Sequence, residues 1–268
     1  MRAVIAVFLA SCGRIGFGVD TPADDVADPD RDGIVDPIDN CPSAANPDQS
    51  DEDDDGLGDV CDPCPPYADN EDLDADGVGG VCDPNPSILG DRITHFSGFD
   101  RLPDDLELAG LWSVSGGQIH IVGSLNSVAA ATWANGGPDI EVVSTHVTID
   151  AMFGAGVARP VGVVHHFDAT SMEGTLCVFG INPSDLEVYA LADNASNGAI
   201  VLVPTNANVG DASSFASRRS GTSYSCDAER LVAPMTGTNM LPGTNRSGLF
   251  ARSASASFDW VMVVRSPP

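Results

Sequence analysis

Residues 51–62 read Asp-Glu-Asp-Asp-Asp-Gly-Leu-Gly-Asp-Val-Cys-Asp, and this stretch decides how the first third of the chain folds. Counted from Asp51, carboxylates stand at positions 1, 3, 5, 9 and 12, and Gly56 stands at position 6. Alternate residues of a curled loop turn their oxygens inward, and glycine permits the sharp turn. The spacing therefore predicts a loop wrapped around a hard divalent cation, and Ca²⁺ is the ion that it favours.

The same spacing occurs at residues 28–39 and 72–83, which gives three loops in all. The residue at position 7 of each loop is expected to add a backbone carbonyl oxygen. The predicted ligands are Asp28, Asp30, Asp32, Ile34, Asp36 and Asp39; Asp51, Asp53, Asp55, Leu57, Asp59 and Asp62; and Asp72, Asp74, Asp76, Val78 and Asp83. The third loop has Gly80 at position 9, so we expect water to replace that ligand and the affinity to be lower. Asn46 and Asp69, each five residues after a cysteine, are weaker candidates for additional ions.

The charge of the chain is strongly acidic and unevenly distributed. The 268 residues carry 39 acidic and 12 basic side chains, all of the latter arginine, for a net charge of -27. Residues 20–90 hold 22 of the acidic side chains and one arginine, with few large apolar residues. Such a segment is either disordered or folds around bound ions, because it cannot bury enough apolar surface. The acidity excludes a nucleic-acid binder and disfavours adsorption to an anionic membrane.

Cysteines frame the acidic loops. The motif Asp39-Asn40-Cys41-Pro42 is followed by 58–62, Gly-Asp-Val-Cys-Asp, and Cys64-Pro65 by 79–83, Gly-Gly-Val-Cys-Asp. This pattern resembles thrombospondin type 3 repeats. The resemblance implies a wire of loops wrapped around Ca²⁺, with disulfides Cys41–Cys61 and Cys64–Cys82. Prolines crowd the flanks, so a helix-loop-helix sensor is not expected. A thiolate zinc site is disfavoured because hard oxygen ligands outnumber the sulfurs.

The N-terminus has the layout of a secretory signal. Residues 1–12 read MRAVIAVFLASC, and Leu9-Ala10-Ser11-Cys12 resembles the bacterial lipobox, which implies lipid on Cys12. An ordinary secreted protein and a mis-assigned start codon are the alternatives. Removing Cys12 leaves six cysteines, an even set that suits disulfides outside the cytoplasm. No run of 18 apolar residues occurs, so no ordinary transmembrane helix is expected.

From about residue 91 the sequence predicts a mainly β domain. Short alternating segments separated by turn signals predict strands at 112–115, 118–122, 128–133, 141–152, 161–167, 175–181, 186–191, 200–203, 247–251 and 258–264. Gly116-Gly117 predicts a two-residue hairpin. In the last strand Phe258, Trp260, Met262 and Val264 are expected on one face at period two. Ten short strands predict an antiparallel β-sandwich of the jelly-roll type.

The end of this domain, from Pro242 to Arg252 and from Ser255 to Val264, resembles the closing strands of concanavalin-A-like lectin/glucanase sandwiches. The resemblance implies a lectin-like domain, and the architecture of thrombospondins implies that the wire docks on it. Cys177 and Cys226 remain as a further disulfide pair, with two buried thiols as the alternative.

No catalytic set emerges from the sequence, so an enzyme is not expected. His165 and His166 are adjacent on a predicted strand and cannot share one ion, and the other histidines are expected at the surface or satisfied in the core. Glu141 and Asp150 lie on one predicted strand but should face opposite sides. The glucanase string Glu-x-Asp-x-x-Glu is absent. Trp112, Trp133 and Trp260 are expected in the core.

These observations predict a signal and lipobox at 1–12, a linker at 13–27, calcium-binding repeats at 28–90 and a concanavalin-A-like sandwich at 91–268. The leading hypothesis is a calcium-binding lipoprotein of the bacterial cell envelope, at the outer membrane or cell surface, or a secreted form. It would contact a membrane only through its lipid and bind glycan or a surface protein. A carbohydrate-active hydrolase and a structural envelope protein without a ligand site are the alternatives.

Overall fold

The computed structural model describes residues 27–134, 140–154, 159–171, 173–182, 185–192, 200–204, 209–221, 223–228, 235–237 and 246–267. Within these ranges the only helices are two 3-10 turns, η1 (Asp36–Ile38) and η2 (Gly80–Cys82), and neither is long enough to cross a bilayer. The predicted lipidation site Cys12 and the linker up to residue 26 lie outside the described residues.

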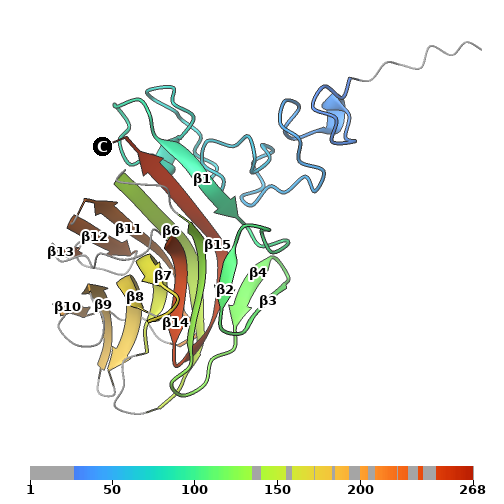
Figure 1. Cartoon of the computed structure of the whole chain (residues 1–268). Helices are drawn as coiled ribbons and strands as arrows, with labels where there is room; N and C mark the ends of the chain where they lie inside the picture. Colours follow the sequence, from blue (N-terminus) through green and yellow to red (C-terminus); the bar gives the residue numbers. More distant parts are fainter. Residues whose placement is uncertain are drawn as a thin grey trace, which may run out of the picture.

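The strands that the structure describes between residues 92 and 266 form an antiparallel sandwich of two sheets, as predicted (Figure 1). One sheet, called sheet A, has the order β13-β12-β11-β6-β15-β4-β3, and β1 also pairs with β15. Its strands are β1 (Arg92–Ser97), β3 (Trp112–Ser115), β4 (Gln118–Ile121), β6 (Ile140–Met152), β11 (Ala212–Ser220), β12 (Ser223–Ala228), β13 (Met235–Gly237) and β15 (Ala254–Ser266).

The second sheet, called sheet B, has the order β10-β9-β8-β7-β14-β5-β2. Its strands are β2 (Glu107–Ala109), β5 (Val128–Ala134), β7 (Val161–Asp168), β8 (Glu173–Asn182), β9 (Asp185–Ala192), β10 (Ile200–Pro204) and β14 (Arg246–Arg252). All ten predicted strands are present with end points shifted by a few residues. The predicted hairpin is also present, because Ser115 pairs with Gln118 and both glycines between them have positive φ.

The core lies between the two sheets and follows the alternation of the strands. Val143, Val147 and Ile149 of β6 face it, together with Val163 of β7 and Leu249 of β14. The disulfide Cys177–Cys226 links β8 of sheet B to β12 of sheet A. The two sheets are therefore joined both by apolar packing and by a covalent bond.

One prediction about β15 is wrong. Phe258 packs in the core between the sheets, whereas Trp260, Met262 and Val264 pack on the outer face of sheet A. A β-bulge between Phe258 and Trp260 shifts the pairing with β6 and reverses the side on which later residues emerge. Trp260 is buried, but it lies outside the sandwich core in which it was expected.

Candidate calcium loops

The three acidic loops share one backbone conformation. Position 4 has positive φ in each loop, with 66° at Arg31, 61° at Asp54 and 64° at Ala75. The glycine at position 6 follows with φ of 95–96° in every loop, at Gly33, Gly56 and Gly77. This left-handed conformation is the one that glycine adopts without steric cost, which explains why glycine stands there in all three loops.

The same hydrogen bonds hold each loop closed. The carboxylate at position 1 accepts the N–H of position 6, at 3.3 Å from Gly33 to Asp28, 3.0 Å from Gly56 to Asp51 and 2.9 Å from Gly77 to Asp72. The carboxylate at position 5 accepts the N–H of position 7, at distances of 2.7, 2.8 and 3.0 Å in the first, second and third loops. Each of these contacts uses one oxygen of the carboxylate concerned.

The structure brings the predicted carboxylates at positions 1, 3 and 5 together. In each loop the three groups place one oxygen each within 4.8 Å of the others; these groups are Asp28, Asp30 and Asp32; Asp51, Asp53 and Asp55; and Asp72, Asp74 and Asp76. Oxygens at such separations repel one another strongly unless a cation lies between them. The arrangement has the donor chemistry that Ca²⁺ requires.

Buried carboxylate oxygens that accept no hydrogen bond indicate whether the loops fit a cation. At position 12, one oxygen of Asp39, Asp62 and Asp83 accepts the N–H two residues later, and the other has no partner. These side chains are only 9, 5 and 9% exposed. At position 3, oxygens of Asp30, Asp53 and Asp74 also lack a partner. Buried carboxylates normally have partners, so the residues present fit a bound cation.

The electrostatics of the loops agree with this interpretation. Burial is the main cause that raises the pKa of Asp62 to about 6, and repulsion from Asp53, Asp55 and Asp51 adds to it. Burial also raises the pKa of Asp83 to about 6, with contributions from Asp91 and Asp74. Asp62 thus lies near the carboxylates of positions 1, 3 and 5 of its loop, and Asp83 lies near Asp74 at position 3 of its own loop.

Each loop is tied to the segment that follows it. The second oxygen of the position 5 carboxylate accepts a hydrogen bond from the backbone N–H of Asn46 in the first loop, at 2.9 Å, and from Asn70 Nδ2 in the second, at 2.6 Å. In the third loop it accepts from the N–H of Gly90 and of Asp91, at 2.9 and 2.6 Å. Sequence reasoning considered Asn46 but missed Asn70 and Asp91, because no spacing rule extends 14 or 15 residues beyond position 5.

The disulfides expected from the resemblance are present. Cys41 bonds to Cys61, and Cys64 bonds to Cys82. The sulfurs of the second pair are part of an apolar cluster on the outer face of sheet A, which we call the docking cluster. It contains Cys64, Val78, Cys82, Trp260, Met262 and Val264, with Tyr67, Ile93, Phe96 and Val142 packed against it.

The docking cluster fixes the third loop to the sandwich. The ring of Tyr67 meets that of Trp260 edge-on, with centroids 5.8 Å apart. Arg218 of β11 donates to the carbonyl of Pro84 and to Asn85 Oδ1, both at 3.0 Å. The first loop projects away from the sandwich, whereas the chain near β1 lies against it (Figure 1). Val78, which was predicted to offer its carbonyl to the ion, has its side chain fully buried in this cluster.

A cavity of about 520 Å³ lies where the second and third loops meet the sandwich. Its walls come from β1 and the loop after it, residues 92–101 and 103, and from residues 48, 50, 59–62, 76 and 77. Arg92 and Arg101 line it together with acidic residues such as Asp59 and Asp100. A cavity with both signs of charge suits a polar ligand more than an apolar one.

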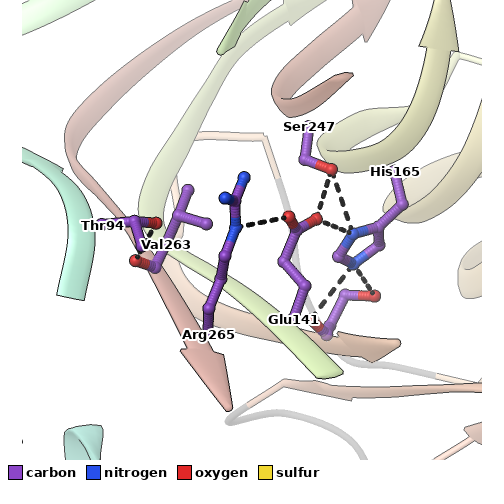
Figure 2. A network of polar contacts seen from close by, with 7 residues as sticks. Thr94, Glu141, His165, Ser247, Val263 and Arg265 are labelled. Carbon is purple, nitrogen blue, oxygen red and sulfur yellow. Dashed lines mark hydrogen bonds and ion pairs between the residues drawn. The ribbon is translucent and has the colours of Figure 1, made fainter. Parts of the chain in front are cut away.

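A second polar group lies inside the sandwich, where sequence reasoning found no site. His165 Nδ1 is 3.0 Å from Glu141 Oε1 and 3.3 Å from Ser247 Oγ, and Arg265 Nε lies 3.5 Å from Glu141 Oε2 (Figure 2). His165 Nε2 faces Ser217 Oγ at 3.0 Å. His165 and Glu141 are fully buried and Ser247 is 1% exposed. This network joins the two sheets, and its burial leaves no access for a substrate.

The other sequence expectations about histidine and acidic residues hold in the structure. His165 is fully buried while its neighbour His166 is partly exposed, and Glu141 is buried while Asp150 on the same strand is exposed. His95 stacks on Trp133 with ring centroids 5.2 Å apart, and burial lowers its pKa. His120 contacts Ser257 Oγ at 2.9 Å. His146 contacts Asp259.

Comparison with protein-family models and with curated proteins finds no match. Solved structures that resemble the chain include the GH43 protein BlXynB from Bacillus licheniformis (12% identity, 63% of this chain and 39% of that chain, TM-score 0.47). Others are the carbohydrate binding module CBM66 from Bacillus subtilis (14%, 57% and 91%, 0.42) and the exoplasmic/lumenal domain of VIP36 in a form bound to Ca²⁺ and Man3GlcNAc (10%, 64% and 89%, 0.47). At these identities the likeness concerns the sandwich fold alone.

Proposed function

We propose that this chain is a calcium-binding protein in which three ions stiffen residues 28–83 and hold this segment against a β-sandwich that binds a partner. The observation that carries the proposal is the set of unpartnered, buried carboxylate oxygens at position 12, repeated in all three loops. Since the loops lack an apolar core of their own, bound ions would supply the cohesion that folds them. The role is that of a binding protein and not of an enzyme.

Calcium titration of the full chain tests the metal proposal. Native mass spectrometry and calorimetry should count at least three ions per chain at millimolar or lower free Ca²⁺. EDTA should open residues 28–83 to protease while the sandwich, which has its own core and disulfide, stays resistant. Equal protease patterns with and without EDTA, or no uptake at millimolar Ca²⁺, would overturn the proposal.

The partner of the sandwich is proposed to be a glycan or a glycosylated surface protein. The cavity at the junction of loops and sandwich supports this, because it offers both arginine and carboxylate groups to a polar ligand. A glycan array probed with and without Ca²⁺ tests it. Asp100→Asn, inside the cavity, should weaken binding of any positive glycan about tenfold or more, and Asp104→Asn, outside the cavity, should not. Hydrolysis of a bound glycan would favour the alternative of a hydrolase, and a blank array that of a structural protein.

We further propose that the chain acts outside the cytoplasm, anchored by lipid on Cys12 or secreted. The three disulfides support an oxidising compartment. Metabolic labelling with a fatty-acid analogue should mark the chain, and Cys12→Ser should abolish the label. Release of unlabelled chain into the medium would favour secretion.

A further inference from the structure

The third loop lacks a carboxylate at position 9, where it has Gly80, and it is followed by an acidic residue, Asp91. We propose that Asp91, the residue before β1, supplies this loop with the carboxylate that Gly80 omits, so that the sandwich is itself part of the third calcium site. This inference rests on the proposed calcium binding. It predicts that the third site is complete only when the loop is docked.

Gly80 cannot be replaced by a residue with a side chain. A Cβ atom at this position would lie 1.9 Å from the carbonyl oxygen of Asp69, and Gly80 has a φ of 54°. The first and second loops carry Asp36 and Asp59 here, so the third loop alone has four carboxylates instead of five. The missing charge lowers the expected affinity unless another residue replaces it.

Asp91 stands 15 residues after the position 5 carboxylate of its loop, as Asn70 does in the second loop. The backbone N–H of Asp91 donates to Asp76 Oδ2, whereas Asn70 donates to Asp55 through its side-chain Nδ2. Gly90 corresponds to Asn46, since each donates its backbone N–H 14 residues after position 5. Where the loop has aspartate at position 9, this following residue is neutral; where the loop has Gly80, it is acidic. Each of the three sites thereby gathers five carboxylates.

The surroundings of Asp91 indicate a missing cation. Its side chain is 2% exposed, and the amide of Asn85 donates to its two oxygens at 3.2 and 3.1 Å. The Asp83 carboxyl lies within hydrogen-bonding reach of Asp91, and its oxygen Oδ2 is buried without a partner. Both oxygens of Asp74 also lack a partner. Within the described ranges, the donors to Asp83 and Asp91 are the backbone N–H and the side-chain amide of Asn85, and the guanidinium of Arg218 contacts Pro84 and Asn85 rather than a carboxylate.

The second loop gives independent support for the position. Asn70 uses its Nδ2 atom to bind Asp55, and its Oδ1 atom has no hydrogen-bond partner in the described part of the chain. A side-chain oxygen at this place is therefore left without a donor in a loop that already has five carboxylates. The second loop thus has an oxygen at this place that a cation could take, whereas Asn46 Oδ1 of the first loop accepts a hydrogen bond from Gln49 Nε2 at 3.0 Å.

Asp91→Asn in the full chain tests the inference, since asparagine keeps the shape and the backbone hydrogen bond. Calorimetric titration with Ca²⁺ should show one of three sites weakened about 10- to 100-fold and the other two unchanged. Asp104→Asn is the matched control, because it removes one exposed carboxylate outside the loops. Adding Asp91→Asn to Asp74→Asn should change little, whereas adding it to Asp53→Asn should weaken a second site.

Two outcomes would overturn the inference and leave calcium binding intact. One is three unchanged sites in Asp91→Asn. The other is a third site whose calcium affinity is weakened by Asp69→Asn and not by Asp91→Asn, since Asp69 also lies beside Gly80. If Asp91→Asn does not fold, Asp91→Glu decides: the longer carboxylate should change the affinity of the third site alone, and three unchanged sites would contradict the inference. No calcium uptake by the unaltered chain would instead defeat the proposed function, and the role of Asp91 with it.

Discussion

Phe258 and Trp260 lie two residues apart on β15 but face opposite sides of sheet A. Because of the bulge between them, β15 contributes apolar side chains to clusters on both faces of sheet A. Before the bulge β15 contributes to the sandwich core, and after it the even-numbered residues form the surface on which the third loop docks, while Val261 and Val263 return to the core. The apolar residues of β15 therefore serve two clusters, and this determines where the calcium loops attach.

Trp260→Ala should remove the centre of the docking cluster. Trp260 is 6% exposed and contacts Tyr67, so the change should lower the free energy of unfolding by about 3–5 kcal/mol. Denaturant unfolding with saturating Ca²⁺ measures the effect. Leu111→Ala is the control, because Leu111 is 78% exposed and should change the value by less than about 0.5 kcal/mol. A small effect of Trp260→Ala would mean that the third loop is not held by this cluster.

The two disulfides of the loop segment should differ in their effect on docking. Replacing Cys64 and Cys82 by alanine removes a bond across 18 residues, worth about 3 kcal/mol on the chain-entropy model, and also takes sulfur atoms from the docking cluster. Replacing Cys41 and Cys61 removes a similar bond outside that cluster. Limited proteolysis in Ca²⁺ should therefore show cleavage near β1 only for the first double variant. Identical cleavage patterns would contradict this expectation.

The loops should respond to pH in opposite ways with and without calcium. Burial and neighbouring carboxylates raise the pKa of Asp62 and of Asp83 from 3.8 to about 6 in the metal-free chain. A raised pKa of an acid contributes stability below its unfolded value, and this stability is lost as the pH rises through about 6. With EDTA the thermal midpoint of the loop segment should therefore decrease as the pH is raised from 4 to 7.

With Ca²⁺ the trend should reverse, because protons compete with the ion for the same oxygens. The apparent calcium affinity should drop as the pH falls below about 6, and the midpoint should rise with pH. Differential scanning calorimetry at several pH values, with EDTA and with Ca²⁺, measures both trends. Parallel trends in the two conditions would show that these carboxylates do not hold the ion.

How far the sequence predicted the structure depends on how local the signal was. The gathering of three carboxylates in each loop and the strand β6 depend on residues within about a dozen positions, and both were predicted correctly. The strands β11 and β12 were missed because they are rich in serine and carry few β-branched residues. β11 forms because it pairs with β6, and β12 because it pairs with β11, which depends on tertiary contacts.

The parts of the site that the sequence did not reveal join distant residues. Asp91 approaches Asp76 only because the third loop folds back on β1, and nothing in their spacing signals this. The contact of Glu141 with His165 joins two strands in different sheets. The bulge in β15 is a third example. The apolar residues on both sides of it alternate regularly in the sequence, but those after the bulge face the opposite side of sheet A from the one that the alternation predicts.

Glu141→Ala should destabilise the sandwich strongly. It would leave His165, Ser247 and Arg265 without the carboxylate that they share inside the protein, and breaking a buried pair of this kind costs about 3–5 kcal/mol. Ser247→Ala removes one hydroxyl and should cost about 1–3 kcal/mol. Asp150→Asn, on the exposed side of the same strand, should cost less than about 1 kcal/mol. Urea unfolding of the three variants in Ca²⁺ should rank them in this order. If Glu141→Ala were as mild as Asp150→Asn, the network would not join the sheets.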